Sequence, residues 1–183
     1  MKMVGRGLAA MALLLMPAIG PHAMADGPGI HWDQVAEGDA RVSSTDPQTN
    51  FGSEDILATS RGNQIYFRVD IPQPTTRAVL KLFPLSNGPG SQIFLTSSNW
   101  DEQAITWNSR PALGQYVGST GPVQIGKWVE FDVTQFICSP APLVVCNRGP
   151  VSFALTSGRG PTEYASREHW LLAGPRLVLY VGG

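Results

Sequence analysis

Histidine is scarce in this sequence, and its scarcity narrows the enzyme classes open to the chain. Only His31 and His169 follow the first 25 residues, and neither lies in a G-x-S-x-G or comparable setting. A serine or cysteine nucleophile needs a histidine to take its proton, and zinc hydrolases place their ligands at spacings such as H-E-x-x-H. No such spacing occurs, so the sequence argues against both classes of hydrolase.

Lysine is also rare, and no run of basic residues exists. The formal net charge is −1, whereas nucleic-acid binders usually carry a concentrated basic surface, so we predict no nucleic-acid partner. Lys81 and Lys127 are the only lysines after residue 25, and arginine carries most of the positive charge. Two explanations stay open: planar guanidinium groups that grip an anionic ligand, or the codon bias of a GC-rich genome.

The one long apolar run lies near the start of the chain and is too short to span a membrane. Lys2 and Arg6 precede the run "LAAMALLLMPAIG", and Ala23-Met24-Ala25 forms an A-x-A cleavage signal. The run falls short of the roughly 20 residues that a spanning helix needs. We expect a signal peptide at 1–25, a flexible lead-in at 26–38 and a domain at 39–183. The protein is therefore predicted to be secreted or otherwise extracytoplasmic, without a membrane span.

Cysteine occurs only at Cys138 and Cys146. An even count in an exported chain makes a disulfide the default, and two cysteines without nearby histidines do not make a structural zinc site. We predict a local disulfide that closes the short segment "SPAPLVV".

Helical periodicity is missing as well. The nearest approach is "TQFI", Thr134 to Ile137, which we expect to form a single turn capped by Thr134. Short segments rich in β-branched and aromatic residues stand between turns rich in glycine and proline. Strands are expected at 40–44, 56–60, 65–71, 77–85, 93–97, 116–117, 127–133, 151–157 and 175–181.

The strand pattern predicts an all-β fold. Without helices to cover a sheet, the strands must bury their apolar faces against one another, which gives an antiparallel β-sandwich with jelly-roll-like topology. In strand 65–71 the odd-numbered residues are apolar and are expected to face the core, while Tyr66, Arg68 and Asp70 are expected to face solvent or a ligand.

Carboxylates offer further candidate sites. Turn-rich sequence supplies oxygen ligands for a structural calcium ion, though without EF-hand spacing: Asp39, Asp46, Asn50, Glu54 and Asp55. We therefore predict no cofactor, with calcium as an open alternative. Glycoside hydrolysis needs two facing carboxylates, and the candidates are Asp70, Glu130, Asp132 and Glu168. Asp70 and Asp132 end strands, where a carboxylate commonly accepts hydrogen bonds from turn N–H groups. A polysaccharide lyase would use Tyr164 or His169 as a base beside Arg167.

Several segments, taken in order, resemble the successive motifs of the DNRLRE-type domain, which is grouped with carbohydrate-binding module family 96. They are "DARVSSTDPQTNFGSEDILATS" (39–60), "YFRVDIP" (66–72), "WDEQAITWNSRPALG" (100–114), "KWVEFDVT" (127–134) and "YASREHWLLAGPRLVLYV" (164–181). The resemblance implies a β-sandwich that binds sugar without catalysis, and characterised members of the family bind alginate-like acidic polysaccharides. Arg68, Arg110 and Arg167 match arginines of the family motifs.

Sugar binding calls for exposed aromatic rings, and uronic acids call for arginine or lysine. The expected ligand-binding residues are Tyr66, Arg68, Lys81, Arg110 and Arg167. Tyr66 and Arg68 are expected to share one patch, with Lys81 on an adjacent strand. An alternative for Arg68 is a cross-strand ion pair on a solvated face.

The tryptophans divide by setting. Trp107 and Trp128 lie in strand-like sequence and are expected in the core, whereas Trp32 and Trp170 lie in expected loops. The segment "WDEQAITWNSRP" is expected to be an irregular excursion that returns to a short strand, 105–107, and mainly holds a loop in place.

Three functions stay open from the sequence. The favoured one is a secreted, non-catalytic module that binds an acidic polysaccharide. The second is an extracellular structural or adhesion protein that associates with other proteins through the sandwich. The third is the small polysaccharide lyase.

Overall fold

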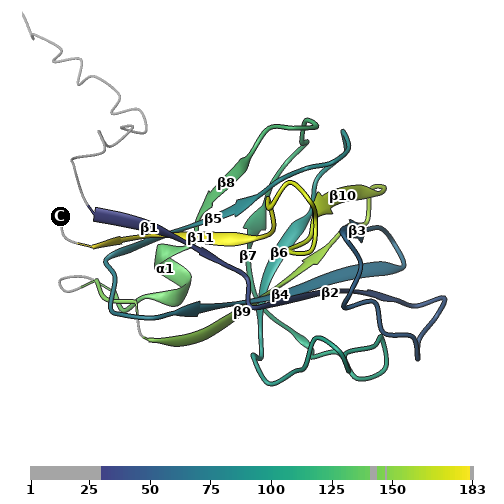
Figure 1. Ribbon diagram of the computed structural model, residues 1–183, viewed down its shortest axis with the longest axis horizontal. Coiled ribbons are helices and arrows are strands. Elements are labelled where there is room, and N and C mark those ends of the chain that lie inside the picture. The colour runs from purple at the N-terminus through teal and green to yellow at the C-terminus, as the bar shows by residue number, and fades with distance from the viewer. Residues whose placement is uncertain (1–29, 141–143, 147, 182–183) are drawn as a thin grey trace, which may run out of the picture.

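Antiparallel strands in two main sheets make up most of the fold (Figure 1). The computed structural model describes residues 30–140, 144–146 and 148–181, and the predicted signal peptide lies outside this range. The first sheet has the strand order β1 (Ile30–Val35), β11 (Arg176–Val181), β5 (Arg77–Leu82) and β8 (Val129–Asp132). The second has the order β2 (Gly38–Ser43), β4 (Asn63–Ile71), β9 (Gly149–Thr156), β6 (Gln92–Thr96) and β7 (Leu113–Ser119). The predicted all-β sandwich is confirmed.

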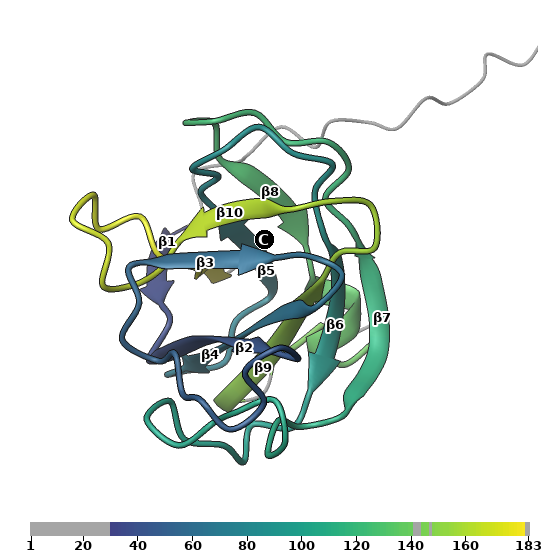
Figure 2. The same ribbon diagram turned by 90° about the vertical axis from the view of Figure 1, so that its right-hand side faces the viewer.

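A two-stranded ribbon closes one end of the sandwich. Strands β3 (Ile56–Thr59) and β10 (Thr162–Ala165) pair with each other, and Figure 2 shows them at the end that faces the viewer. Two backbone hydrogen bonds join β10 to the chain that continues from β5: Ala165 N donates to Phe83 O at 2.9 Å, and Leu85 N donates to Glu163 O at 2.8 Å. The ribbon is therefore an extension of the first sheet.

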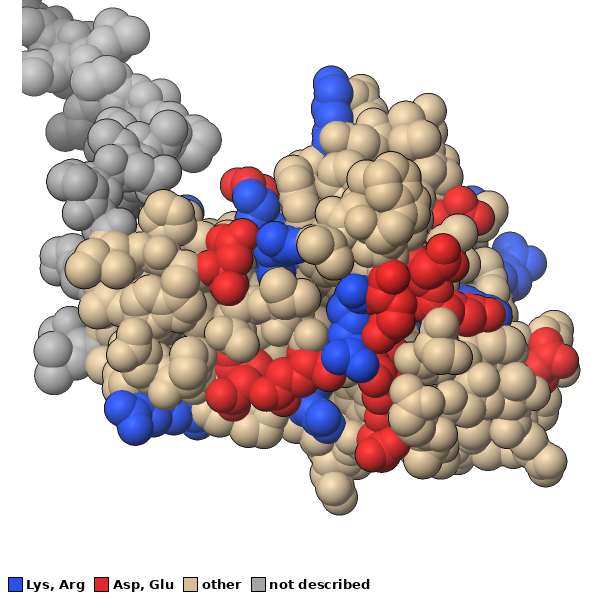
Figure 3. Space-filling model, in the orientation of Figure 1, with Lys and Arg blue, Asp and Glu red and all other residues tan. Residues whose placement is uncertain are grey.

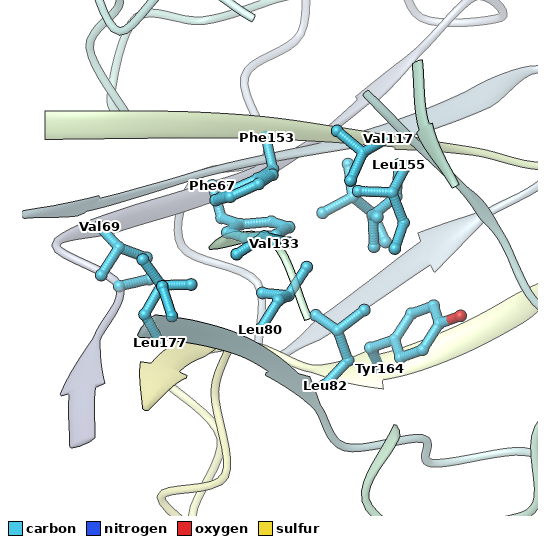
Figure 4. Packing of buried hydrophobic residues seen from close by; sticks show 14 of the residues in the cluster. Phe67, Val69, Leu80, Leu82, Val117, Val133, Phe153, Leu155, Tyr164 and Leu177 are labelled. Atoms are coloured by element: carbon cyan, nitrogen blue, oxygen red, sulfur yellow. The ribbon is translucent and has the colours of Figure 1, made fainter. Parts of the chain in front are cut away.

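The main core lies between the two sheets, as the alternation in the sequence predicts. Ile65, Phe67, Val69 and Ile71 of β4 are at most 2% exposed, and Phe67 stacks on Phe153 of β9 with ring centroids 5.3 Å apart. Figure 4 shows these side chains meeting others from the first sheet, among them Leu80, Leu82 and Leu177. Burial of this apolar surface is the dominant favourable term in folding.

A second, smaller cluster lies on the outer side of the five-stranded sheet. Residues 97–112 fold over this side, and Ile105 packs there on Ala40, Val42, Tyr66 and Ala154, with Trp100 and Trp107 against the cluster. We call residues 97–112 the covering loop. The sequence predicted that Tyr66, on the even-numbered face of β4, meets solvent or a ligand. This prediction is wrong, because the covering loop buries Tyr66 fully.

Several local predictions are wrong. Residues 105–107 form no strand, although Ile105 is buried as expected. Part of the predicted lead-in forms β1, an edge strand paired with β11. Its inward residues, Trp32 and Gln34, are only half buried, and one of them is polar, so the sequence shows little apolar alternation there. Trp32 packs on the core and does not lie in a loop as predicted.

The predicted helical turn is present as α1 (Thr134–Ile137), but its cap differs from the prediction. The N-cap residue is Val133, and its side chain makes no capping hydrogen bond. The Thr134 hydroxyl instead accepts a hydrogen bond from Ala78 N at 3.0 Å, which ties the turn to β5. The predicted disulfide between Cys138 and Cys146 follows this turn and is confirmed.

Candidate functional site

Two of the predicted ligand-binding arginines hold the covering loop. Arg68 Nη1 donates to the carbonyl oxygens of Ser98, at 3.3 Å, and Trp100, at 2.6 Å. Arg110 donates from Nη1 to the carbonyl oxygen of Trp107 and stacks on that ring, with its Cζ 3.6 Å from the centroid. Arg68 thus ties the loop to β4. Arg110, which belongs to the loop, donates from Nε to Gln64 Oε1 of β4 at 3.2 Å, so both guanidinium groups hold the loop in place.

Tyr66 of β4 lies beneath the covering loop, near Arg110 of that loop. Its hydroxyl lies 3.0 Å from Gln64 Oε1 and 2.9 Å from the carbonyl oxygen of Pro111, and it can donate to either. Burial raises the pKa of Tyr66 to about 12, against a smaller opposing effect of the Arg110 charge. The structure thus brings Tyr66 and Arg110 together at a pocket of about 270 Å³, which Leu113 also lines. The Tyr66 ring is buried and presents no surface on which a sugar could stack.

Arg167 lies in a cluster of three carboxylates. Its Nε and Nη2 donate to the two carboxylate oxygens of Glu102 at 2.9 and 2.6 Å, and Nε lies 2.8 Å from Glu168 Oε1. The Arg167 backbone N–H donates to Asp39 Oδ2 at 2.8 Å. Burial, and then the charges of Glu168 and Glu102, raise the pKa of Asp39 to about 8, although the hydrogen bond from Arg167 opposes them.

Lys81 lies far from this group in the fold. It belongs to β5 of the four-stranded sheet, whereas Tyr66 and Arg68 belong to β4 of the other sheet. The predicted adjacency of these strands is therefore wrong. Lys81 projects from the outer face of its sheet, because its neighbours Leu80 and Leu82 fill the core and successive side chains of a strand alternate.

Trp128 lies beside Lys81 on this outer face, not in the core as predicted. Trp128 immediately precedes β8 and is 36% exposed, whereas Val129 and Phe131 of that strand pack on the core. Lys81 Nζ lies 5.2 Å from the Trp128 ring centroid and Arg176 Cζ lies 4.8 Å from it. Both distances suit cation–π contacts.

A second aromatic ring and cation occupy the same face. Arg77 Cζ lies 4.9 Å from the ring centroid of Tyr180, and β11 pairs with β5 so that Tyr180 is opposite Arg77 and Arg176 is opposite Lys81. We call Trp128, Tyr180, Arg77, Lys81 and Arg176 the aromatic–cationic face. Of these residues, the sequence prediction named only Lys81 as a ligand-binding residue. The signal for Trp128, Arg176 and Tyr180 was the outward half of the alternation in "KWVEFDV" and "PRLVLYV".

Each cation of this face also has an acidic partner. The pairs are Lys81 with Glu130 at 2.9 Å, Arg77 with Asp132 at 3.0 Å and Arg176 with Asp33 at 3.3 Å. Figure 3 shows acidic and basic side chains interspersed on the visible side of the molecule rather than gathered by sign. The aromatic–cationic face is therefore close to neutral, and its cations are held beside the rings.

Three of the four carboxylates considered for glycoside hydrolysis have structural partners. Glu130 and Asp132 pair with the cations above, and Glu168 pairs with Arg167. Partial burial acts to raise the pKa of Asp132, but hydrogen bonds from Thr134 and Arg77 outweigh it and hold the pKa below its ordinary value. Thr134 N donates to Asp132 at 2.9 Å, which confirms the predicted role at a strand end.

The residues considered for a lyase are not arranged as an accessible base. Tyr164 is fully buried in the main core (Figure 4), where its hydroxyl contacts Ser91 at 3.1 Å, and burial raises its pKa. His169 is 6% exposed, and its Nδ1 accepts a hydrogen bond from Leu171 N at 3.2 Å. Both side chains therefore serve the fold.

The calcium ligands considered from the sequence do not gather. Glu54 binds Arg41 through both oxygens, at 2.8 and 2.9 Å, and Asn50 Nδ2 donates to the carbonyls of Glu102 and Ile105, both at 2.8 Å. Within the described ranges, the one group of acidic side chains close enough to share an ion contains Asp39 together with Glu102 and Glu168.

The fold is an antiparallel β-sandwich that carries aromatic rings on the outer face of one sheet. The chain matches the family model of carbohydrate-binding module family 96 over residues 32–180, and it belongs to that family. It is thus a carbohydrate-binding module, as its sequence motifs implied. No curated protein matches the chain. Among the described residues, no helix has the length and apolar character needed to cross a membrane.

Proposed function

We propose that this chain is an exported, non-catalytic module that binds an acidic, uronic-acid polysaccharide through the aromatic–cationic face. The observation that carries the proposal is the exposed Trp128 ring with the cations of Lys81 and Arg176 near it. A sugar ring stacks its apolar C–H side on an indole, and a carboxylate at the edge of that sugar then meets the flanking cations. The disulfide suits an oxidising compartment outside the cytoplasm.

The acidic partners of these cations do not prevent binding of an anion. Glu130, Asp132 and Asp33 have side chains that are 57, 51 and 45% exposed, and exposed ion pairs contribute only about 0–1 kcal/mol. A uronate carboxylate can therefore replace Glu130 beside Lys81 at little cost. The cations are less exposed than their partners, with Lys81 at 22% and Arg176 at 14%, so they stay beside the ring when the partner leaves.

Binding to the covering-loop side has less support. Arg68, Arg110 and Arg167 direct their guanidinium groups at carbonyls and carboxylates of the protein itself, and Tyr66 is buried. A sugar there would compete with contacts that hold the fold. In this proposal the three arginines are positioning residues, and Lys81 alone of the originally predicted set contacts ligand.

The test is affinity electrophoresis and calorimetry on alginate, pectin and a neutral glucan, with Trp128→Ala and Lys81→Ala beside the wild type. We expect retention on an acidic polymer. Trp128→Ala should lose about five- to hundredfold in affinity, because removal of a stacking ring costs about 1–3 kcal/mol. Lys81→Ala should lose about tenfold or more, because a hydrogen bond to a charged group contributes about 1.5–3 kcal/mol. Trp170→Ala is the matched control, since Trp170 is 77% exposed in a loop and lies outside the aromatic–cationic face. No retention of the wild type on any of the polymers would refute the proposal.

The alternative of an adhesion protein rests on that same loop. Trp170, Leu171 and Leu172 are 77, 42 and 77% exposed, a small apolar tip of the kind that contacts other proteins. If the wild type binds none of the polymers and Trp170→Ala alone changes its self-association in analytical ultracentrifugation, this alternative replaces the first proposal.

A further inference from the structure

A second candidate ligand site lies at the carboxylate cluster, apart from the aromatic–cationic face. Asp39 comes from β2, Glu102 from the covering loop, and Glu168 from the segment after β10. One carboxylate oxygen from each residue lies within 4.8 Å of one from each of the others. Three segments distant in the sequence thus place acidic oxygens around one point.

Asp39 gives an independent sign that something is bound there. Asp39 is only 1% exposed. Its Oδ1 accepts no hydrogen bond from the part of the chain that the structure describes. The other oxygen accepts from Arg167 N. A buried carboxylate oxygen without a partner is costly, and in native proteins such an atom calls for an ion or a water molecule.

The charge of the cluster favours an ion over a water molecule. Arg167 is the cation in contact with the cluster, through Glu102 and Glu168. A bound cation has all three groups as carboxylates, because Asp39 gives up its proton when the ion binds. Against the Arg167 guanidinium, the three negative charges then sum to about −2, which a divalent cation cancels and a water molecule leaves unbalanced. All the candidate ligand atoms are carboxylate oxygens, which suit a hard cation such as Ca²⁺ rather than zinc or copper.

We propose that the chain binds one Ca²⁺ ion through the carboxylates of Asp39, Glu102 and Glu168. The ion fastens β2 and the covering loop to the segment that follows β10. Glu168 is the most exposed of the three ligands, so the ion enters from its side. The site goes beyond sugar binding and does not depend on the polysaccharide proposed above.

The test uses the full chain after removal of metals with a chelator. Calorimetric titration with CaCl₂ should show one site per chain, and Tm should rise with the Ca²⁺ concentration because the ion binds only the folded state. Glu168→Gln and Asp39→Asn should each weaken binding by at least the roughly tenfold that even outer partners of a metal site contribute. Glu54→Gln is the control, since Glu54 binds Arg41 outside the cluster, and it should keep wild-type affinity.

Glu168→Gln is the decisive variant, because Glu168 is exposed and its replacement leaves the buried Asp39 in place. Circular dichroism shows whether each variant folds. Absence of Ca²⁺ binding by the metal-free wild type would overturn the proposal. So would undiminished binding by a folded Glu168→Gln variant. A parallel titration with MgCl₂ should show weaker binding, since Mg²⁺ demands a stricter octahedral geometry.

Discussion

At the scale of single residues, the neighbours of each charged group determine its role. Lys81 and Arg68 are both cations on strands, yet Lys81 lies against an exposed indole and an exposed carboxylate. Arg68 donates to two backbone carbonyls. An ion pair with an exposed partner exchanges readily for a ligand, whereas a guanidinium bound to half-buried carbonyls leaves them without a donor if it moves.

Glu130→Gln tests whether Lys81 is available to a ligand. The change removes the carboxylate 2.9 Å from Lys81 Nζ and keeps the shape of the side chain. We expect affinity for the acidic polymer to rise by about two- to fivefold, the worth of one exposed ion pair, while affinity for a neutral glucan stays the same. Calorimetric titration measures both, and a fall in affinity for the acidic polymer would contradict the proposed site.

Tyr66 is expected to make the folded protein less stable at alkaline pH. Its pKa is about 12 in the folded protein, against 10.0 ordinarily, so the folded state holds the phenolic proton more tightly than the unfolded state does. The resulting stability is complete below pH about 10 and is lost as the pH rises from about 10 to about 12, up to about 3 kcal/mol.

The measurement is urea unfolding at several pH values for the wild type and Tyr66→Phe. Tyr164 also has a raised pKa, so the variant should still lose stability in alkali, but along a shallower curve. Equal slopes for the two proteins would show that Tyr66 does not carry this dependence.

At the scale of elements, the covering loop is the feature that divides the two faces of the sandwich. It is joined to the body by arginines, by Asn50 and by a close backbone approach at Gly52, where an added Cβ would come within 2.1 Å of the Glu102 carbonyl oxygen. Only glycine permits that approach. The loop therefore closes the outer side of β4, and the sheet face that stays open is on the other sheet.

Arg68→Ala tests this assignment. Loss of its hydrogen bonds to the carbonyls of Ser98 and Trp100 should lower the free energy of unfolding by about 2–3 kcal/mol, which chemical denaturation measures. Affinity for the acidic polymer, measured below the unfolding transition, should stay within about twofold of wild type. A large loss of affinity with unchanged stability would instead place ligand at Arg68.

At the scale of the whole molecule, the sandwich places residues that the sequence predicted to act together on two different sides. Asp39, Arg68, Glu102, Arg110 and Arg167 belong to motifs spread over the chain, and the fold gathers them on one side, around the covering loop and the carboxylate cluster. Trp128 and Lys81 lie on the outer face of the other sheet. The motif residues of this side thus hold the fold, while the proposed sugar-binding residues lie opposite them.

The sequence by itself determined the all-β class, most of the strands, the inward residues of β4, the disulfide and the family. These follow from local rules: side chains alternate along a strand, turns need particular residues, and paired cysteines oxidise outside the cytoplasm. Only the tertiary structure decided which outward residues meet solvent. Tyr66 and Trp128 both occupy positions outside the main core, yet the covering loop buries Tyr66 and leaves Trp128 exposed. The exposure of a strand residue depends on what packs over it from elsewhere in the chain, and alternation along the strand carries no information about that.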